Sequence, residues 1–399
     1  MNNLIKLILK KNPTRLIVHP YEKKIIASFN IKKTISLDNY NNIQDFNKKI
    51  NKETGGENLL IGGFSFDSIN YVKKEEWNDF PIAEFIIPEY AVKFEKNKLY
   101  HYGSDDNLKN YFSSATKNIN IKDCVNTLSV KEKNLEEWTN LIKRAKESIK
   151  NSSLEKIVVA NRQKIHLSKI DIGKTIQNLI IRYPNCTTFM YKNGESIFFG
   201  STPEKIFDYD GEVLRIQALA SSIPNNGQKF SEIESSFKNC TLRKEHNIVV
   251  NHFIQKIKSI SKEKIIISDP MIIELENIYH LLTKLQIKIK HLNHLNILES
   301  LHPSPALSGY PVDEAIEWIR KYETFHRGWY SGTIGYIDNN QSHFYAALRC
   351  ANFLSNKQTI MAYAGNGIVE NSNADFEIKE LKSKFKVIKN SIGFENVTA

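Results

Sequence analysis

Two carboxylates and a lysine share one face of a predicted helix near the end of the chain. In the segment SNADFEIKELKSKFKVIKN, Glu377, Glu380 and Lys384 are spaced at i, i+3 and i+7, which places them on one side of an α-helix. The Ser-Asn pair that opens the segment is a suitable cap for a helix over 374–391. The pattern predicts acidic side chains at the edge of a buried face, although taken alone it also fits a solvated cluster of charges.

A third carboxylate is predicted to face inward from another helix. The segment 231–260 is expected to be helical, and Val249, Phe253 and Ile257 mark its buried face. Glu245 lies four residues before Val249 on that face, where a carboxylate is costly unless it is paired or bound to a metal. Three glutamates from two converging helices would make an oxygen-rich site. Such a site suits Mg²⁺, with waters and a substrate carboxylate completing the octahedron.

A lysine is predicted on the apolar face of a strand. In EKIVVANRQKI, a strand expected over 155–165, Lys156 shares a face with Val158 and Ala160. Desolvation favours loss of the lysine proton, so such a lysine can serve as a base. A lysine at a strand end that extends to water is the simpler interpretation.

An arginine and a glycine-rich segment are candidates for anion binding. Arg349 is predicted within a strand over 343–353 and is flanked on its face by alanines, which leaves room for a bidentate carboxylate; a structural ion pair is the alternative. In YAGNGIV (363–369), glycines allow backbone N–H groups to approach an anion, whereas a plain hairpin turn is the alternative. The segment lacks the third glycine of a dinucleotide-binding loop, so we reject that interpretation.

The remaining elements follow from hydrophobic periodicity and turn residues. Residues 1–130 are interpreted as an N-terminal β-rich portion of the fold and residues 131–399 as the portion that carries catalysis. No linker marks this division. Within the second portion the sequence predicts helices over 135–149 and 172–182, a strand over 196–200 and a hairpin at Asp210-Gly211.

Composition excludes several classes of protein. The formal net charge is +11, but the lysines are scattered rather than clustered, so no nucleic-acid partner is expected. No run approaches the roughly 20 apolar residues that cross a bilayer, and Lys6 interrupts an N-terminal apolar stretch that is too short for a signal peptide. We therefore expect a cytoplasmic monomer without a membrane partner.

The cysteines do not suggest a metal site or a disulfide framework. They are widely spaced and form no CxxC pair. Free thiols are the simpler interpretation. They are Cys124, Cys186, Cys240 and Cys350.

Taken in order, these segments resemble the chorismate-binding enzyme family. The resemblance runs from about Leu154 to Asn390, with a weaker match at IGGFSFD. Three further stretches match the family pattern: GSTPEKIF (200–207), LHPSPALSGYP (301–311) and ETFHRGWYSGTIGYID (323–338). The resemblance implies an α+β fold with two large antiparallel sheets packed together and flanked by helices. The active site would lie between them, with chorismate as substrate.

The resemblance also implies roles for particular residues. Glu245 and Glu380 would hold Mg²⁺, with Glu377 close by or acting through water. The residues expected to contact the substrate are Ala220, Ser222, His302, Arg349, Tyr363, Gly365 and Lys384. The family usually has glycine where this chain has Ser221, and alanine where it has Asn366.

Two positions sort the reactions within the family. Amine-adding members carry Gln where this chain has Lys156, and others use a lysine nucleophile where it has Ala220. The chain therefore resembles the water-adding branch. This implies an isomerase of the isochorismate synthase type, in which Lys156 activates water and Glu204 protonates the departing hydroxyl. Its product would feed menaquinone or siderophore biosynthesis. A salicylate synthase and a catalytically inactive binding protein on the same fold are the alternatives.

Overall fold

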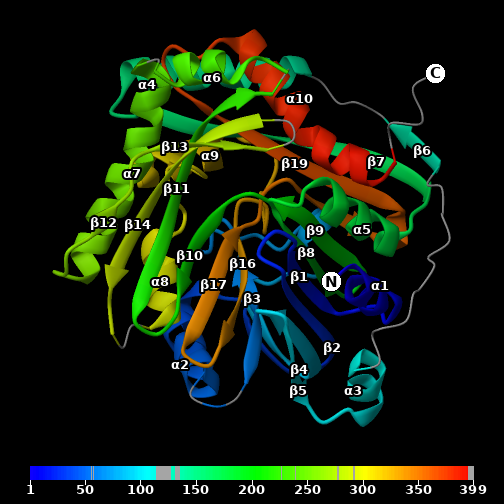
Figure 1. Ribbon diagram of the computed structural model, residues 1–399. Helices are drawn as coiled ribbons and strands as arrows, with labels where there is room; N and C mark the ends of the chain where they lie inside the picture. The colour runs from blue at the N-terminus through cyan, green and yellow to red at the C-terminus, as the bar shows by residue number, and fades with distance from the viewer. Residues whose placement is uncertain are drawn as a thin grey trace.

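The fold is that of a computed structural model of the chain. It describes residues 1–54, 56, 58–113, 127–130, 135–225, 227–238, 240–275, 278–290 and 293–393. Strands and helices are mixed along the whole of this part (Figure 1). The strand pairings are all antiparallel, and they connect the strands into one hydrogen-bonded path rather than two separate sheets.

The first arm of this path carries Lys156 at its edge. It begins at β7, and each strand is hydrogen-bonded to the next one in the arm. The order is β7 (Lys156–Lys169), β19 (Thr359–Ile368), β18 (Cys350–Leu354), β9 (Ser196–Thr202), β8 (Thr187–Asn193) and β1 (Arg15–His19). The edge strands β6 (Thr127–Val130) and β15 (Gly309–Tyr310) pair with β7.

The second arm continues from β1 and ends at β14. Its order is β2 (Lys24–Leu37), β4 (Ala83–Glu95), β3 (Leu59–Phe64), β16 (Thr333–Asp338), β17 (Gln341–Ala346), β10 (Lys205–Tyr209), β11 (Val213–Pro224) and β14 (Ile278–Lys288). Short strands extend it at β4 and β14: β5 (Lys98–Gly103), β12 (Ile266–Ile267) and β13 (Met271–Glu274).

The N-terminal strands form the middle of this path. β1 pairs with β8, and β3 pairs with β16, so residues before and after 130 share the same hydrogen-bonded network. The division into portions 1–130 and 131–399 stays a prediction. The α+β class with antiparallel strands is confirmed, with the two expected sheets joined through β1 and β2.

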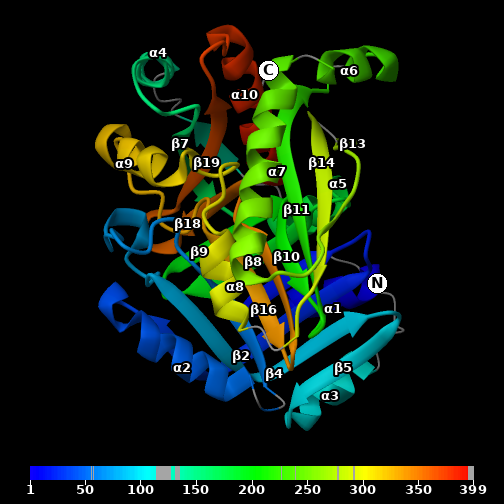
Figure 2. The same cartoon turned by 90° about the vertical axis from the view of Figure 1, so that its left-hand side faces the viewer.

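Helices cover the arms and carry the predicted acidic residues. α10 (Ala374–Ser391) packs along β19, and α7 (Cys240–Ile260) runs beside β11 (Figure 2). The side chain of Asn373 caps α10 by accepting hydrogen bonds from the backbone N–H groups of Asp375 and Phe376, as the sequence predicts. The other helices are α1 (Asn2–Lys10), α2 (Ile43–Thr54), α3 (Asp106–Ser113), α4 (Leu135–Asn151), α5 (Ile172–Arg182), α6 (Phe230–Phe237), α8 (His294–Leu301) and α9 (Val312–Tyr322).

Most predicted elements are found at their expected places, and two differ. The single helix expected over 231–260 is divided into α6 and α7. The strand expected over 343–353 is broken between β17 and β18, where Arg349 has a φ of 46°. Arg349 therefore lies in the connection between the two strands and not on a strand face.

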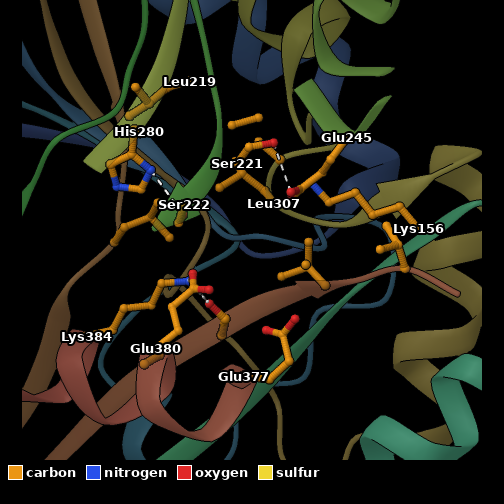
Figure 3. A pocket seen from close by; sticks show the side chains of 18 of the residues that line it. Lys156, Leu219, Ser221, Ser222, Glu245, His280, Leu307, Glu377, Glu380 and Lys384 are labelled. Carbon is orange, nitrogen blue, oxygen red and sulfur yellow. Dashed lines mark hydrogen bonds and ion pairs between the residues drawn. The ribbon is translucent and has the colours of Figure 1, made fainter. Parts of the chain in front are cut away.

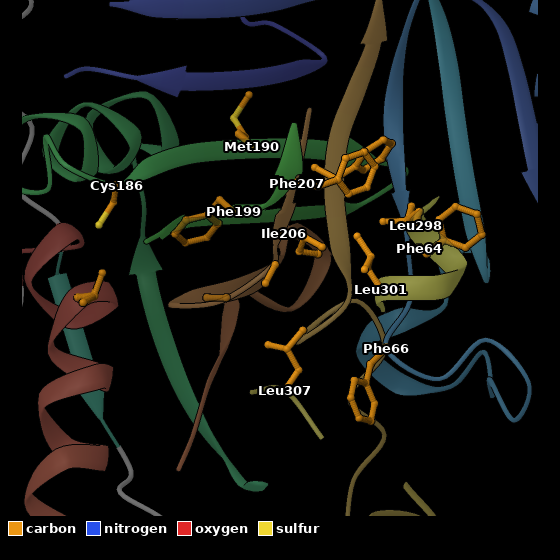
Figure 4. Close-up of a cluster of buried hydrophobic side chains, with 14 of the residues drawn as sticks. Phe64, Phe66, Cys186, Met190, Phe199, Ile206, Phe207, Leu298, Leu301 and Leu307 are labelled. Atoms are coloured by element: carbon orange, nitrogen blue, oxygen red, sulfur yellow. The ribbon is translucent and has the colours of Figure 1, made fainter. Parts of the chain in front are cut away.

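Apolar side chains fill the space beneath the two arms. The largest cluster combines strand residues such as Phe64 and Phe207 with Leu298 and Leu301 of α8 (Figure 4). Leu307 belongs to the same cluster and also lines the main cavity, so the core and the site share a wall. In the described part of the chain, no helix has the length and apolar character needed to cross a membrane. Among these residues Cys186, Cys240 and Cys350 form no disulfide, and Cys124 lies outside them.

Candidate active site

A cavity of about 340 Å³ lies where the two ends of the strand path face each other. Its walls come from β7 and β19 on one side and from β11 and β14 on the other, with α7 and α10 closing it (Figure 3). Ten of the predicted site residues line it: Lys156, Glu204, Ala220, Ser222, Glu245, Arg349, Gly365, Glu377, Glu380 and Lys384.

Lys156 is the first residue of β7, and its side chain is only 2% exposed. Its Nζ atom lies 2.8 Å from Oε1 of Glu245 on α7, across the cavity from its own strand. The lysine that the sequence suggested as a base is therefore held by a counter-ion in this structure, and not in a purely apolar setting.

The glycines of YAGNGIV lie within β19 and do not form a turn. A Cβ atom on Gly367 would lie 2.5 Å from Cε of Lys156 and 2.8 Å from Oε1 of Glu245. Such distances are too short for any side chain. The glycine therefore leaves space for the Lys156–Glu245 pair. The segment is part of a strand and not a hairpin turn, whereas anion binding by its backbone stays a prediction.

Glu377 and Glu380 project from the first turns of α10 into the same cavity. Burial and the neighbouring Glu380 raise the pKa of Glu377 to about 7. Nδ2 of Asn366 donates to Oε2 of Glu377 at 2.8 Å. Lys384 pairs with Glu380 at 2.7 Å and also donates to the backbone oxygen of Gly365. Asn366, which replaces the usual alanine, thus stabilises one of the predicted acidic residues.

The donor set is compatible with a hard divalent cation. Three carboxylates from α7 and α10 line one cavity, and mutual repulsion contributes to the raised pKa of Glu377; oxygen ligands of this kind suit Mg²⁺. In the described residues the three do not converge as a ligand cluster, because Glu245 and Glu380 are each turned toward a lysine. Glu245, Glu377 and Glu380 therefore fit the ion if these pairs exchange partners.

Glu204 lies between β9 and β10 and is almost fully buried. Burial raises the pKa of its carboxyl group to about 7, although the nearby Lys156, Arg349 and Lys384 oppose this shift. Its backbone oxygen accepts a hydrogen bond from the backbone N–H of Ala346, which fixes the connection to β17. A carboxyl group with this pKa can hold a proton at neutral pH and release it during a reaction.

Arg349 and His280 are neighbouring polar side chains in the wall of the cavity. Only Arg349 was predicted from the sequence. Nη2 of Arg349 lies 3.5 Å from Nε2 of His280, and Nδ1 of His280 lies 3.1 Å from Oγ of Ser222, its partner across β11 and β14. Burial, followed by repulsion from Arg349 and Lys384, holds the pKa of His280 well below its usual value. His280 was not predicted; the only signal was one histidine within the apolar strand IYHLL.

Two predicted contact residues lie elsewhere. The hydroxyl of Tyr363 donates to Oε1 of Glu76 at 2.9 Å, and its ring stacks on Trp77 and Tyr330, so the side chain is part of the aromatic core. His302 lines a separate cavity with Phe64 and Phe66, where burial lowers its pKa to about 3. Neither residue is among those that line the main cavity, and their contact with the substrate stays a prediction.

Comparison with known proteins identifies the family. The model of the chorismate binding enzyme family matches residues 22–393, and the chain belongs to this family. Isochorismate synthase MenF of Escherichia coli is 30% identical over 255 residues, which cover 62% of this chain and 58% of the relative. The MenF protein of Bacillus subtilis is 26% identical over 363 residues, covering 84% and 75%. The chain thus spans less than two thirds of the E. coli relative.

Solved structures confirm the fold without separating the reactions. Menaquinone-specific isochorismate synthase from E. coli has a TM-score of 0.77 at 21% identity, covering 97% of this chain and 91% of that one. Anthranilate synthase component I from Streptococcus pneumoniae has a TM-score of 0.76 at 18% identity, covering 92% of both. Because two different enzymes match almost equally well, the reaction must be argued from the residues in the cavity.

Proposed function

We propose that the protein is an isochorismate synthase that converts chorismate to isochorismate with Mg²⁺ as cofactor. The observation that carries this proposal is the presence of Lys156 and Glu204 in one cavity, with the pKa of Glu204 raised to about 7. One residue is suited to take a proton from water and the other to supply a proton at neutral pH. The curated relatives of this chain carry the same activity in their names.

The proposed reaction exchanges one hydroxyl group for another. Water attacks C2 of the ring, the ring double bonds shift, and the bond from C4 to its hydroxyl group breaks. Lys156 takes a proton from the attacking water, and Glu204 gives a proton to the departing hydroxyl. Chorismate and isochorismate have the same composition and differ in the positions of the hydroxyl group and the ring double bonds. The reaction therefore needs no redox partner.

Lys156 must lose its counter-ion before it can act as a base. Its Nζ atom lies 2.8 Å from Oε1 of Glu245, and the two side chains form an ion pair. Glu245, Glu377 and Glu380 would hold Mg²⁺, which would supply a positive charge for a carboxylate of the substrate. Glu245 would then no longer pair with Lys156, and Lys156 would be available to act on the water. Substrate loading and activation of the base are therefore coupled.

The cationic side of the cavity is suited to a dianionic substrate. Arg349 and Lys384 lie in its wall, and Lys384 already donates to the backbone oxygen of Gly365. We assign these groups, with Ser222, to binding of the substrate carboxylates, because a guanidinium and an ammonium are the usual partners of such groups. Ala220 supplies no amine at the position where other members of the family use a lysine nucleophile.

The experiment is incubation of the purified protein with chorismate and Mg²⁺, followed by identification of the products by chromatography and mass spectrometry. The proposal predicts isochorismate in equilibrium with chorismate and no pyruvate. A coupled lactate dehydrogenase assay measures pyruvate. Stoichiometric pyruvate with salicylate would identify a salicylate synthase instead, and unchanged chorismate would contradict the proposal.

A further inference from the structure

Ser221 has a backbone conformation that serine rarely adopts. Its φ is 63°, in the left-handed region where a Cβ atom is crowded. It lies at a bulge of β11, where pairing with β14 shifts between Ala220 and Ser222. Glycine takes this conformation without strain, and residues strained in this way cluster at functional sites. The serine side chain is therefore expected to contribute something that glycine does not.

The hydroxyl group of Ser221 contacts the helix that carries Glu245. Its Oγ atom lies 2.9 Å from Oε2 of Glu245 and 2.6 Å from the backbone oxygen of Leu242, both on α7 (Figure 3). A hydroxyl group has one proton, and both neighbours are acceptors, so they share it. The contact joins the bulge of β11 to the turn of α7 that presents the carboxylate.

The two oxygens of the Glu245 carboxylate have different partners. Oε2 accepts from the neutral hydroxyl of Ser221, whereas Oε1 pairs with the charged Nζ of Lys156 at 2.8 Å. The neutral donor can hold Oε2 in place while Oε1 changes its partner. Carboxylates that bind metals are often oriented by hydrogen bonds from groups that do not themselves touch the metal. Loss of such a hydrogen bond typically costs about 10- to 100-fold in metal affinity or activity.

We propose that Ser221 is a positioning residue that fixes the carboxylate of Glu245. It holds the carboxylate whose Oε1 pairs with Lys156, and it would hold the same carboxylate toward a bound cation. The inference rests on the proposed function for the identity of cation and substrate, but the contact between Ser221 and Glu245 does not depend on it.

Two substitutions separate the hydroxyl group from the backbone conformation. Ser221→Ala removes the hydroxyl and keeps a Cβ atom at positive φ. Ser221→Gly removes the hydroxyl and also relieves the strain. Gln358→Gly is the matched control, because Gln358 has a φ of 44° at an exposed turn away from the cavity. Each protein is compared with the wild type by steady-state kinetics, by the shift in melting temperature that Mg²⁺ causes without chorismate, and by crystallography.

If the hydroxyl positions Glu245, the alanine and glycine variants share one functional defect. Both should need about tenfold more Mg²⁺ for half-maximal activity and should lose about tenfold in kcat/KM. Both should also show a smaller Mg²⁺-induced shift in melting temperature. In the crystal structure of Ser221→Ala, Glu245 should leave its position beside Lys156. Ser221→Gly should melt higher than Ser221→Ala, and Gln358→Gly should keep wild-type kinetics.

Three results would overturn the inference. Glu245 unmoved in the Ser221→Ala crystal structure would show that the hydroxyl does not hold it. Wild-type kinetics in Ser221→Gly alone would assign the effect to backbone strain. Lower melting temperatures with unchanged kinetics would make the contact merely structural. If the wild type does not convert chorismate, the proposed function fails, whereas the position of Glu245 in the alanine variant still tests the inference.

Discussion

Two groups of buried charges lie on the two sides of strand β7. In one group each charge has a partner within the protein, whereas in the other the burial of the charges is not fully compensated. On one side, Arg327 and Glu323 form an ion pair at 2.5 Å, with both side chains at most 2% exposed. Arg327 also donates to the backbone oxygens of Val158 and Leu307, and Glu323 accepts from the backbone N–H of Ala160. On the other side is the cavity lined by Lys156, Glu204 and the three glutamates Glu245, Glu377 and Glu380.

The difference shows how buried charge can be either structural or reactive. The Arg327–Glu323 pair has a partner for each of its charges within the protein, which is the arrangement that makes a buried ion pair tolerable. In the cavity, the pKa values of Glu204 and Glu377 are raised to about 7 because burial is not fully compensated. Perturbed carboxyl groups in a cavity are typical of functional sites. We therefore expect substitutions on the two sides of β7 to have different consequences.

The largest expected effect is that of removing the metal, because Glu245, Glu377 and Glu380 are its proposed ligands and line one cavity. Dialysis against excess EDTA should abolish conversion of chorismate, and Mg²⁺ should restore it. Glu245→Gln should raise both the Mg²⁺ concentration for half-maximal activity and the KM for chorismate. Glu234→Gln, at an exposed site on α6, is the control. Full turnover in EDTA would show that the reaction does not need a metal ion.

The second-largest effect should be the loss of turnover when either proposed proton-transfer residue is replaced. Lys156→Ala and Glu204→Ala should each lose about 100-fold or more in turnover while still binding chorismate. Their effects should be non-additive, because proton removal and proton donation belong to one displacement. Forward and reverse rates are measured beside affinity, with Lys164→Ala at an exposed position of β7 as control. Near-wild-type turnover in either variant would refute that residue's role.

On the other side of β7 the main effect should be on stability. Glu323→Gln leaves Arg327 buried with an incomplete partner, which should cost about 3 kcal/mol of unfolding free energy. Urea denaturation at pH 7 measures this value. Once corrected for the folded fraction, kcat should change far less than in Lys156→Ala. A loss in kcat as large as that of Lys156→Ala would mean that the two sides of the strand are not distinct.

A smaller effect concerns stability as a function of pH. The folded-state pKa of Glu204 is raised from 4.5 to about 7, so its contribution to stability is fully present below pH 4.5 and is lost as pH rises through about 7. Glu204→Gln stays neutral and avoids this loss. The variant should therefore gain about 3 kcal/mol relative to the wild type between pH 4.5 and pH 8. Parallel stability curves for the two proteins would show that Glu204 ionises normally.

Much of the site was predictable because several of its residues lie in short sequence motifs. The spacing of Glu377, Glu380 and Lys384 fixes one face of α10, and the apolar pattern around Glu245 fixes one face of α7. Helical periodicity then points these side chains inward wherever the helices lie. The α+β class and most element boundaries also followed from periodicity and family motifs.

The remainder depends on contacts between segments that are distant in the sequence. Tyr363 lies two residues before Gly365 on the same strand, yet its hydroxyl is taken by Glu76, which no local pattern reveals. The pairing of Ser222 with His280 depends on the register of β11 against β14. The break at Arg349 depends on its left-handed backbone, which only the folded chain imposes.

The most direct test of the central claim is the titration of Glu204 itself. The protein is labelled with ¹³C at glutamate carboxyl carbons, and the Glu204 signal is assigned by its absence from Glu204→Gln. We expect the Glu204 carboxyl group to titrate with a midpoint near pH 7, because burial disfavours the charged carboxylate. Lys156→Ala should move the midpoint upward, because Lys156 lowers the pKa of Glu204. A midpoint near 4.5, the ordinary value for glutamate, would contradict the claim that this cavity holds a proton donor at neutral pH.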